Sequence, residues 1–151
     1  MPRLILTCGL PGAGKTTLAK RLEREVPAIL LCPDEWIHGL GVDLFDEPFR
    51  ARLEHRFKTL ARHLLHHGQD VILDFGFWDR AERDELREMA RALGAQVELR
   101  YLEVPFAELV RRLEIRNRDG FVVITEDLMT GYAQVFEAPD AAELGLYDNR
   151  P

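Results

Sequence analysis

Cysteines are few in this sequence, and long apolar runs are missing from it. Its 151 residues include two cysteines, Cys8 and Cys32, which cannot build a disulfide framework and lack the spacing of a metal site. Each follows an apolar run, so we expect both to be small buried residues at strand ends. The apolar run at residues 4–8 is too short for a signal peptide or a membrane span. We therefore expect a protein of a reducing, cytoplasmic compartment that does not act in a membrane.

The sequence also lacks an excess of positive charge. It carries 20 lysine and arginine residues against 26 aspartate and glutamate residues, a net charge of −6. Proteins that bind nucleic acid without regard to sequence usually carry a basic excess, so this balance argues against that class, although not against a local basic groove. A hydrophobic fraction of 46% and this length fit one globular domain over residues 1–151. We expect a monomer or a weak homodimer.

Short apolar runs alternate with amphipathic segments along the chain. The apolar runs predict strands at residues 4–8, 28–32, 70–75 and 96–104. The helical spacing of apolar residues predicts helices at 15–26, 46–68, 80–94, 105–117 and 125–137. This alternation predicts an α/β fold, in which helices cover both faces of a parallel sheet of four to five strands. We expect an irregular tail from Pro139, where a fifth strand could use only Leu146 and Tyr147.

A glycine-rich stretch, GLPGAGKTT, occupies residues 9–17. It fits the pattern G-x-x-x-x-G-K-[ST] and has the context that this pattern requires, an apolar strand before it and an amphipathic helix after it. Glycines let backbone N–H groups surround a phosphate, and the following helix N-terminus adds favourable partial charge. We expect ATP there, with Lys15 on its β- and γ-phosphates and Thr16 as a ligand of Mg²⁺. The expected nucleotide contacts are Gly9, Leu10, Pro11, Gly12, Ala13, Gly14, Lys15, Thr16 and Thr17.

Two carboxylates follow the second and third predicted strands, at the edge where a parallel sheet places its working loops. Asp34 could accept the proton of an attacking hydroxyl, or it could cap a short helix; Glu35 is a weaker candidate for the same role. Asp74 ends the stretch VILD and could orient Mg²⁺ or water, or it could cap a turn. The two carboxylates would lie near the glycine-rich loop if their strands flank the first strand.

Arginines gather late in the chain. We expect Arg116 and Arg118 to stabilise charge during transfer and Arg112 to contact the nucleotide, within a lid segment at about residues 112–124. The alternative is a solvated basic face, and Arg111 is a weaker candidate.

Aromatic and histidine side chains offer two further groups. The aromatic residues that follow the strand ends could wall an acceptor pocket or belong to the core; they are Trp36, Phe75, Phe77 and Trp78. Four histidines share one predicted helix, with irregular spacing and no cysteine nearby, which indicates an exposed face rather than a metal site. They are His55, His63, His66 and His67.

Together these motifs resemble the small P-loop kinases, an AAA-type ATP-binding family that includes zeta-toxin-like proteins, chloramphenicol phosphotransferase and the kinase domain of polynucleotide kinase. GLPGAGKTT, CPDEW, VILDFGFWDRAERDEL and VPFAELVRRLEIRN occur in the order and rough spacing of that family. The resemblance implies a three-layer P-loop NTPase fold of the nucleoside-kinase type, with the second and third strands on one side of the first. It also implies that Asp34 is the general base, that Asp74 organises the acceptor side, and that Arg116 and Arg118 belong to the lid.

The motifs and the resemblance predict an ATP-dependent phosphotransferase that uses Mg²⁺ and acts on a hydroxyl of a small molecule. Two alternatives stay open, a nucleotide-binding ATPase switch without an acceptor and a 5′-hydroxyl polynucleotide kinase. Polynucleotide kinases resemble DD-Y-R after the second strand, whereas this sequence has DEWI, so the arginine that would hold an acceptor phosphate is missing. A basic groove could come only from the helix that bears Arg50, Arg52, Arg56 and Arg62.

Overall fold

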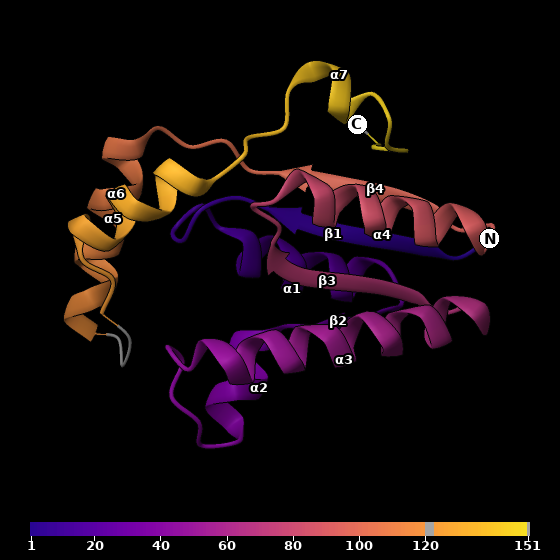
Figure 1. Ribbon diagram of the computed structural model, residues 1–151, viewed down its shortest axis with the longest axis horizontal. Coiled ribbons are helices and arrows are strands. Elements are labelled where there is room, and N and C mark those ends of the chain that lie inside the picture. The colour runs from indigo at the N-terminus through magenta and orange to yellow at the C-terminus, as the bar shows by residue number, and fades with distance from the viewer. Residues whose placement is uncertain (120–122, 151) are drawn as a thin grey trace.

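A four-stranded parallel sheet forms the centre of the molecule (Figure 1). The computed structural model describes residues 1–119 and 123–150, with the backbone only at Asp119. The strands are β1 (Arg3–Cys8), β2 (Ala28–Leu31), β3 (Asp70–Gly76) and β4 (Gln96–Tyr101), in the order β2-β3-β1-β4. In register, Ile5 of β1 lies between Ile72 of β3 and Glu98 of β4. The predicted parallel sheet is confirmed, and β2 and β3 lie on one side of β1 as the resemblance implies.

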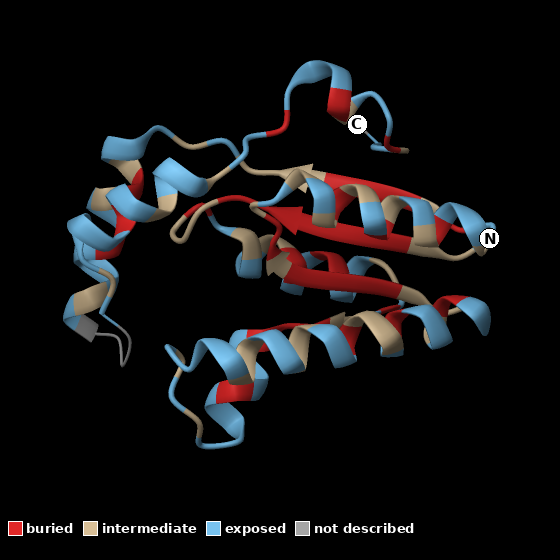
Figure 2. Cartoon of the chain, in the orientation of Figure 1, coloured by how far each residue is buried: buried red, intermediate tan, exposed pale blue. Residues whose placement is uncertain are grey.

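Helices cover both faces of this sheet because side chains along each strand alternate between the faces. Leu4 and Leu6 of β1 pack in one core cluster with residues of α3 (Glu47–His66) and α4 (Arg80–Ala92). Ile5 points to the other face and packs with residues of α1 (Lys15–Glu25). Figure 2 shows the result, buried strands between helices whose outer faces are exposed. The three-layer arrangement follows from this alternation.

Three further helices lie toward the carboxyl ends of the strands. Pro33 begins α2 (Pro33–Gly39) directly after β2, since proline is tolerated in a first helical turn. α5 (Phe106–Asp119) and α6 (Glu126–Val135) stand beyond the arrowheads of the strands in Figure 1. Ala13 of the glycine-rich loop packs there with residues of both helices, Leu109, Leu113 and Met129. Polar residues cap three helices at their N-termini. The side chains of Asp46, Asp79 and Thr125 accept hydrogen bonds from backbone N–H groups in the first turns of α3, α4 and α6.

The tail is ordered rather than irregular, which corrects the expectation for residues after Pro139. It contains a short helix, α7 (Ala141–Leu144), and no fifth strand among the described residues. The Asp148 side chain accepts from the Val97 N–H at 3.0 Å, and the Asn149 side chain accepts from the Leu99 N–H at 2.8 Å. An unpaired strand edge invites association with other chains, and here side chains of the tail cover the β4 edge instead of a strand.

One ion pair fixes this tail to the body of the protein. Arg83 of α4 and Glu143 of α7 are almost completely buried and form two hydrogen bonds, of 2.7 and 2.9 Å. Arg83 also donates to the carbonyl of Phe77 at 2.8 Å. Phe77 has a positive φ of 49°, a conformation that non-glycine residues seldom adopt, so the arginine supports a strained turn directly after β3.

The cysteines and the histidines have the burial that the sequence predicts. Cys8 and Cys32 are free and buried, and the three histidines of α3 and its C-cap residue His67 are exposed. Among the described residues, no cluster of three or more potential ligands of the His, Cys, Asp or Glu type is present. Over the same part of the chain, none of the helices has the length and apolar character needed to cross a bilayer.

Candidate active site

The glycine-rich loop joins β1 to α1 and is held by the segment that follows β3. Gly9, Gly12 and Gly14 have positive φ angles of 152°, 86° and 95°, in a region that favours glycine. A Cβ atom at Gly9 would lie 3.1 Å from the Leu102 carbonyl oxygen, so a larger residue would displace the loop. The Trp78 indole N–H donates to the Gly9 carbonyl at 3.1 Å. The loop is therefore a shaped phosphate cradle at the N-terminus of α1.

Lys15 lies inside this cradle. Its ammonium group donates to the Leu10 carbonyl at 2.9 Å, which closes the loop on itself. Burial lowers the pKa of Lys15, while the nearby carboxylates of Asp74 and Asp34 act in the opposite direction. Two of the predicted carboxylates therefore lie close enough to Lys15 to act on its ammonium group.

Asp74 is buried beneath the loop and accepts two hydroxyl hydrogen bonds. Thr16 donates to one oxygen at 2.8 Å, and Thr7 of β1 donates to the other at 2.5 Å. Thr7 was not among the predicted site residues, although its place near the end of the apolar run LILTC puts it at the same edge of the sheet. A hydroxyl and a carboxylate at one place suit Mg²⁺, which takes few protein ligands and otherwise binds water and phosphate oxygens.

Asp34 lies in the first turn of α2, with its side chain 60% exposed. It does not cap that helix, because the N-cap residue is Cys32 and no side-chain cap bond forms there. Its carboxylate instead pairs with Arg50 of α3 at 2.5 Å. The carboxylate is therefore held in place while much of it stays open to the cavity. Asp34 and Asp74 were expected near the loop if their strands both flank β1. This holds for β3, which contains Asp74 and lies beside β1, whereas β2, which precedes Asp34, is one strand farther away.

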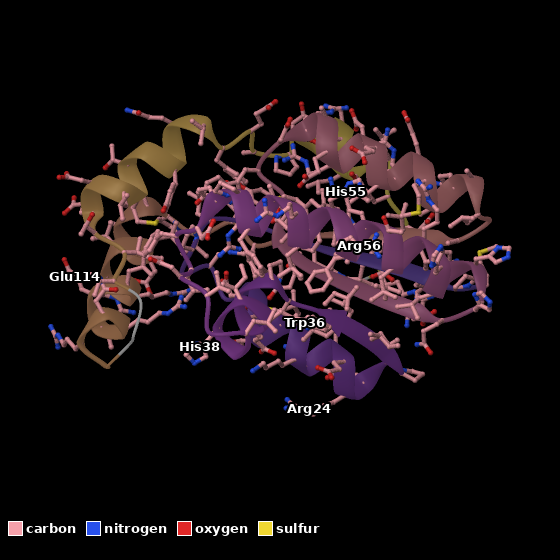
Figure 3. All side chains as sticks on the ribbon, turned by 60° about the horizontal axis from the view of Figure 1, so that its bottom comes forward. Arg24, Trp36, His38, His55, Arg56 and Glu114 are labelled. Carbon is pink, nitrogen blue, oxygen red and sulfur yellow. The ribbon has the colours of Figure 1, made fainter. Side chains whose placement is uncertain are left out.

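These groups share one cavity of about 810 Å³. Of the loop residues, Pro11, Gly12, Gly14, Lys15, Thr16 and Thr17 line it, together with Asp34, Glu35 and Asp74. Phe75, Phe77 and Trp78 form part of its wall, as predicted. Trp36, which is labelled in Figure 3, is not among the lining residues. Its ring packs edge-on against Phe57, with centroids 5.1 Å apart.

The arginines of α5 divide into two groups. Arg112 and Arg116 line the cavity, and Arg112 donates to the Gly12 carbonyl at 3.1 Å. Arg118 is exposed and does not line the cavity, and Arg111 pairs with Glu108 at 2.6 Å. The predicted lid at 112–124 includes residues 120–122, which lie outside the described part of the chain.

Other lining residues were missed because their positions follow from packing rather than from a motif. Glu47, Arg50 and Glu54 of α3, Glu82 of α4 and Tyr132 of α6 all reach the cavity. Long-range contacts bring them there: Lys58 of α3, for example, pairs with Glu82 at 3.0 Å. The helical spacing predicted α3, but not which of its polar residues would face the loop.

Comparison with known proteins identifies the family. The model of the AAA domain family matches residues 4–139. The chain belongs to this family. It is 33% identical to an adenylyl-sulfate kinase of Shewanella denitrificans over 99% of this chain and 75% of that protein. The resemblance to the small P-loop kinases is therefore confirmed.

Solved structures agree with this assignment. The fold resembles the APS kinase of Mycobacterium tuberculosis in complex with AMPPNP and APS, with a TM-score of 0.61 and 25% identity over 82% of this chain and 78% of that chain. It also resembles a chain of the Pnkp1/Rnl/Hen1 RNA repair complex, with a TM-score of 0.76 and 23% identity over 89% of this chain and 43% of that chain. The latter likeness concerns the fold alone. The family and its members make this protein an enzyme, an ATP-dependent phosphotransferase that acts on a small-molecule hydroxyl.

Proposed function

We propose that Asp34 is the general base of this kinase, which transfers the γ-phosphate of ATP to a hydroxyl in the cavity between α2, α3 and the phosphate loop. The observation that carries the proposal is the arrangement around Lys15. Asp34 and Asp74 both act on its ammonium group, but Asp74 is buried and bonded to two threonines, whereas Asp34 is open to the cavity. Of these two carboxylates, Asp34 is therefore the one that an acceptor hydroxyl can reach.

The triphosphate would lie along the loop residues that line the cavity, with Lys15 released from the Leu10 carbonyl to its β- and γ-phosphates. Arg112 and Arg116 would add positive charge from α5. Thr16 and Asp74 would hold Mg²⁺, which neutralises charge on the outer phosphates when it is bound. These groups supply mainly position and electrostatic stabilisation, the two contributions that dominate phosphoryl transfer.

Asp34 would then accept the proton of the acceptor hydroxyl as its oxygen attacks the γ-phosphorus. The ion pair with Arg50 fixes the carboxylate, since Arg50 also donates to the Leu44 carbonyl at 3.3 Å. One carboxylate oxygen bonds the guanidinium, which leaves the second oxygen for the hydroxyl. Arg50 is thus a positioning residue of the base.

The two alternative functions have less support. A switch without an acceptor would not need the cavity that extends beyond the phosphate loop to Asp34. A polynucleotide kinase would need a basic groove. Of the four arginines that could form one, Arg50 lines the cavity but pairs with Asp34, whereas Arg52, Arg56 and Arg62 are exposed and do not line it; Arg56 is labelled on α3 in Figure 3. We also propose a monomer or weak homodimer in the cytoplasm, where its two free cysteines would stay reduced.

The proposal is tested by a screen for phosphorylated products. The protein is incubated with ATP, Mg²⁺ and a panel of hydroxylated metabolites, antibiotics, adenylyl sulfate and 5′-hydroxyl oligonucleotides, and products are detected by mass spectrometry. Adenylyl sulfate belongs in the panel because a 33% identical relative is a kinase of that name. We expect a small-molecule product that is lost with Asp34→Asn. ATP hydrolysis without any phosphorylated acceptor would support the switch instead.

A further inference from the structure

We propose that the acceptor carries a positive charge, as an amino alcohol or an aminated sugar does, and that Glu54 of α3 pairs with its ammonium group. This inference rests on the proposed function, which already makes the cavity the acceptor site. The proposed kinase function depends on the phosphate loop and Asp34. The charge of the remaining cavity wall affects only which acceptor binds there.

The cavity is divided by charge. The cations Lys15, Arg112 and Arg116 belong to α1 and α5, beside the phosphate loop, where the triphosphate is expected. The rest of the wall comes from α2, α3, α4 and the turn after β3, and its charged residues are mainly carboxylates. These are Asp34, Glu35, Glu47, Glu54, Asp79 and Glu82, against the single lining arginine Arg50. An anionic acceptor would be repelled by this wall and by ATP, whereas a cation would be attracted by both.

Most of these carboxylates already have a partner within the protein. Glu35 pairs with Lys20 at 2.8 Å, and Glu82 pairs with Lys58 at 3.0 Å. Asp34 pairs with Arg50, and Asp79 caps α4.

Glu54 differs from these four carboxylates. It is partly buried in the wall and forms no hydrogen bond or ion pair with the described residues. Arg50 and Lys58 act on Glu54 electrostatically without a hydrogen bond. A half-buried carboxylate without a hydrogen-bonded partner is unfavourable, and a ligand ammonium group would supply one.

The ionisation of Glu54 agrees with this geometry. Burial, with a further contribution from Glu82, raises the pKa of Glu54 to about 7, against the opposing effect of Arg50 and Lys58. Glu47 on the same helix acts in the same direction as Glu82. A cationic acceptor should therefore bind more tightly as the pH rises through about 7, because Glu54 then becomes ionised.

Aromatic rings beside this wall suit the same kind of ligand. Phe75 and Phe77 stack with their centroids 5.0 Å apart, and Trp78 lies against Tyr132 at 4.9 Å. All four residues line the cavity. Aromatic faces attract cations and also bind the carbon skeleton of a sugar or alcohol. Phe77 is buried, so the partly exposed rings of Phe75, Trp78 and Tyr132 offer these contacts.

The test uses a panel of hydroxyl compounds sorted by charge at pH 7.5. Amino sugars, amino alcohols and aminoglycosides are compared with neutral sugars and nucleosides and with sugar acids and nucleotides, each with ATP and Mg²⁺. We expect the acceptor with the highest kcat/KM to be cationic. A best acceptor that is neutral or anionic would overturn the inference and leave the proposed kinase function intact. Transfer to none of the compounds would count against both the kinase function and the cationic acceptor. If ATP were still hydrolysed in that case, the proposed kinase function would be the one that is wrong.

A matched pair of variants tests the role of Glu54 itself. Glu54→Gln should raise the KM for the cationic acceptor about tenfold, as loss of a charge-assisted contact does, with kcat within about twofold. It should also remove the dependence of KM on pH around 7 and leave a neutral analogue unaffected. The control is Glu88→Gln, an exposed glutamate of α4 outside the cavity lining, which should change nothing. An unchanged KM for the cation with Glu54→Gln would overturn the assignment.

Discussion

The hydroxyl of Thr16 donates a 2.8 Å hydrogen bond to Asp74, a residue 58 positions farther along the chain. This contact joins the start of α1 to the end of β3 and shows why the phosphate loop requires the neighbouring strand. β1 and β3 are paired in parallel, so the loop after one strand and the carboxylate at the end of the other meet at the same edge of the sheet.

Asp74→Asn should weaken Mg²⁺ binding. The amide keeps the size of the side chain but removes the charge that would attract the cation. We expect the Mg²⁺ concentration needed for half-maximal transfer to rise about 10- to 100-fold. Thr7→Val should cause a smaller shift, since it removes one hydrogen bond that orients Asp74. An unchanged Mg²⁺ titration curve for Asp74→Asn would show that the carboxylate serves only to hold the loop.

Lys15→Met should abolish ATP binding while stabilising the nucleotide-free protein. Because burial lowers the pKa of Lys15, folding disfavours the charged form of this side chain. Methionine keeps most of the side-chain volume without the charge. We expect the Tm to rise by about 2 to 4 °C, which corresponds to about 1 kcal/mol for a chain of this size. Scanning calorimetry and ATP titration measure the two effects; a lower Tm together with intact ATP binding would contradict this account of Lys15.

Glu54→Gln should change how the free energy of unfolding depends on pH. The pKa of Glu54 is raised to about 7 in the folded protein, so its contribution to stability is present in full below the pKa of the unfolded chain and is lost as the pH rises through about 7. The variant should therefore be more stable than the wild type at pH 8, and the difference should shrink toward pH 4. Urea unfolding at several pH values measures this difference. A constant difference between the two proteins across that range would rule out titration of Glu54 as its cause.

Glu143→Gln should destabilise the protein strongly. It leaves the buried guanidinium of Arg83 without a counter-charge, and removal of one partner of a buried ion pair costs about 3 to 5 kcal/mol. The double variant Arg83→Met, Glu143→Leu should recover much of this loss, because neither charge is then left alone in the core. Urea unfolding of the single and double variants gives the comparison. If the free energy of unfolding of Glu143→Gln lay within about 1 kcal/mol of the wild-type value, the result would contradict a structural role for the pair.

The sequence predicted those features that depend on local patterns. The glycine loop, Asp34 and Asp74 could be found because a motif or a strand end marks each of them. Arg50 and Glu54 could not, because their position in the cavity depends on how α3 packs against β3 and α2. The ordered tail was missed for a related reason, since Asp148 and Asn149 bond the β4 edge through side chains, without an apolar strand pattern. The place of Trp36 after β2 allowed either the wall of the cavity or the core, and its ring packs on Phe57 outside the cavity lining.

The central claim is that Asp34 serves the chemical step and not the binding of ATP. The most direct measurement compares wild-type and Asp34→Asn proteins for ATP affinity, by calorimetric titration, and for the rate of phosphoryl transfer to the acceptor found in the screen. Glu35→Gln, which removes the neighbouring carboxylate that pairs with Lys20, is the matched control. We predict unchanged ATP affinity and a transfer rate lowered about 10²- to 10⁴-fold for Asp34→Asn alone. Transfer at the wild-type rate by Asp34→Asn would contradict the account.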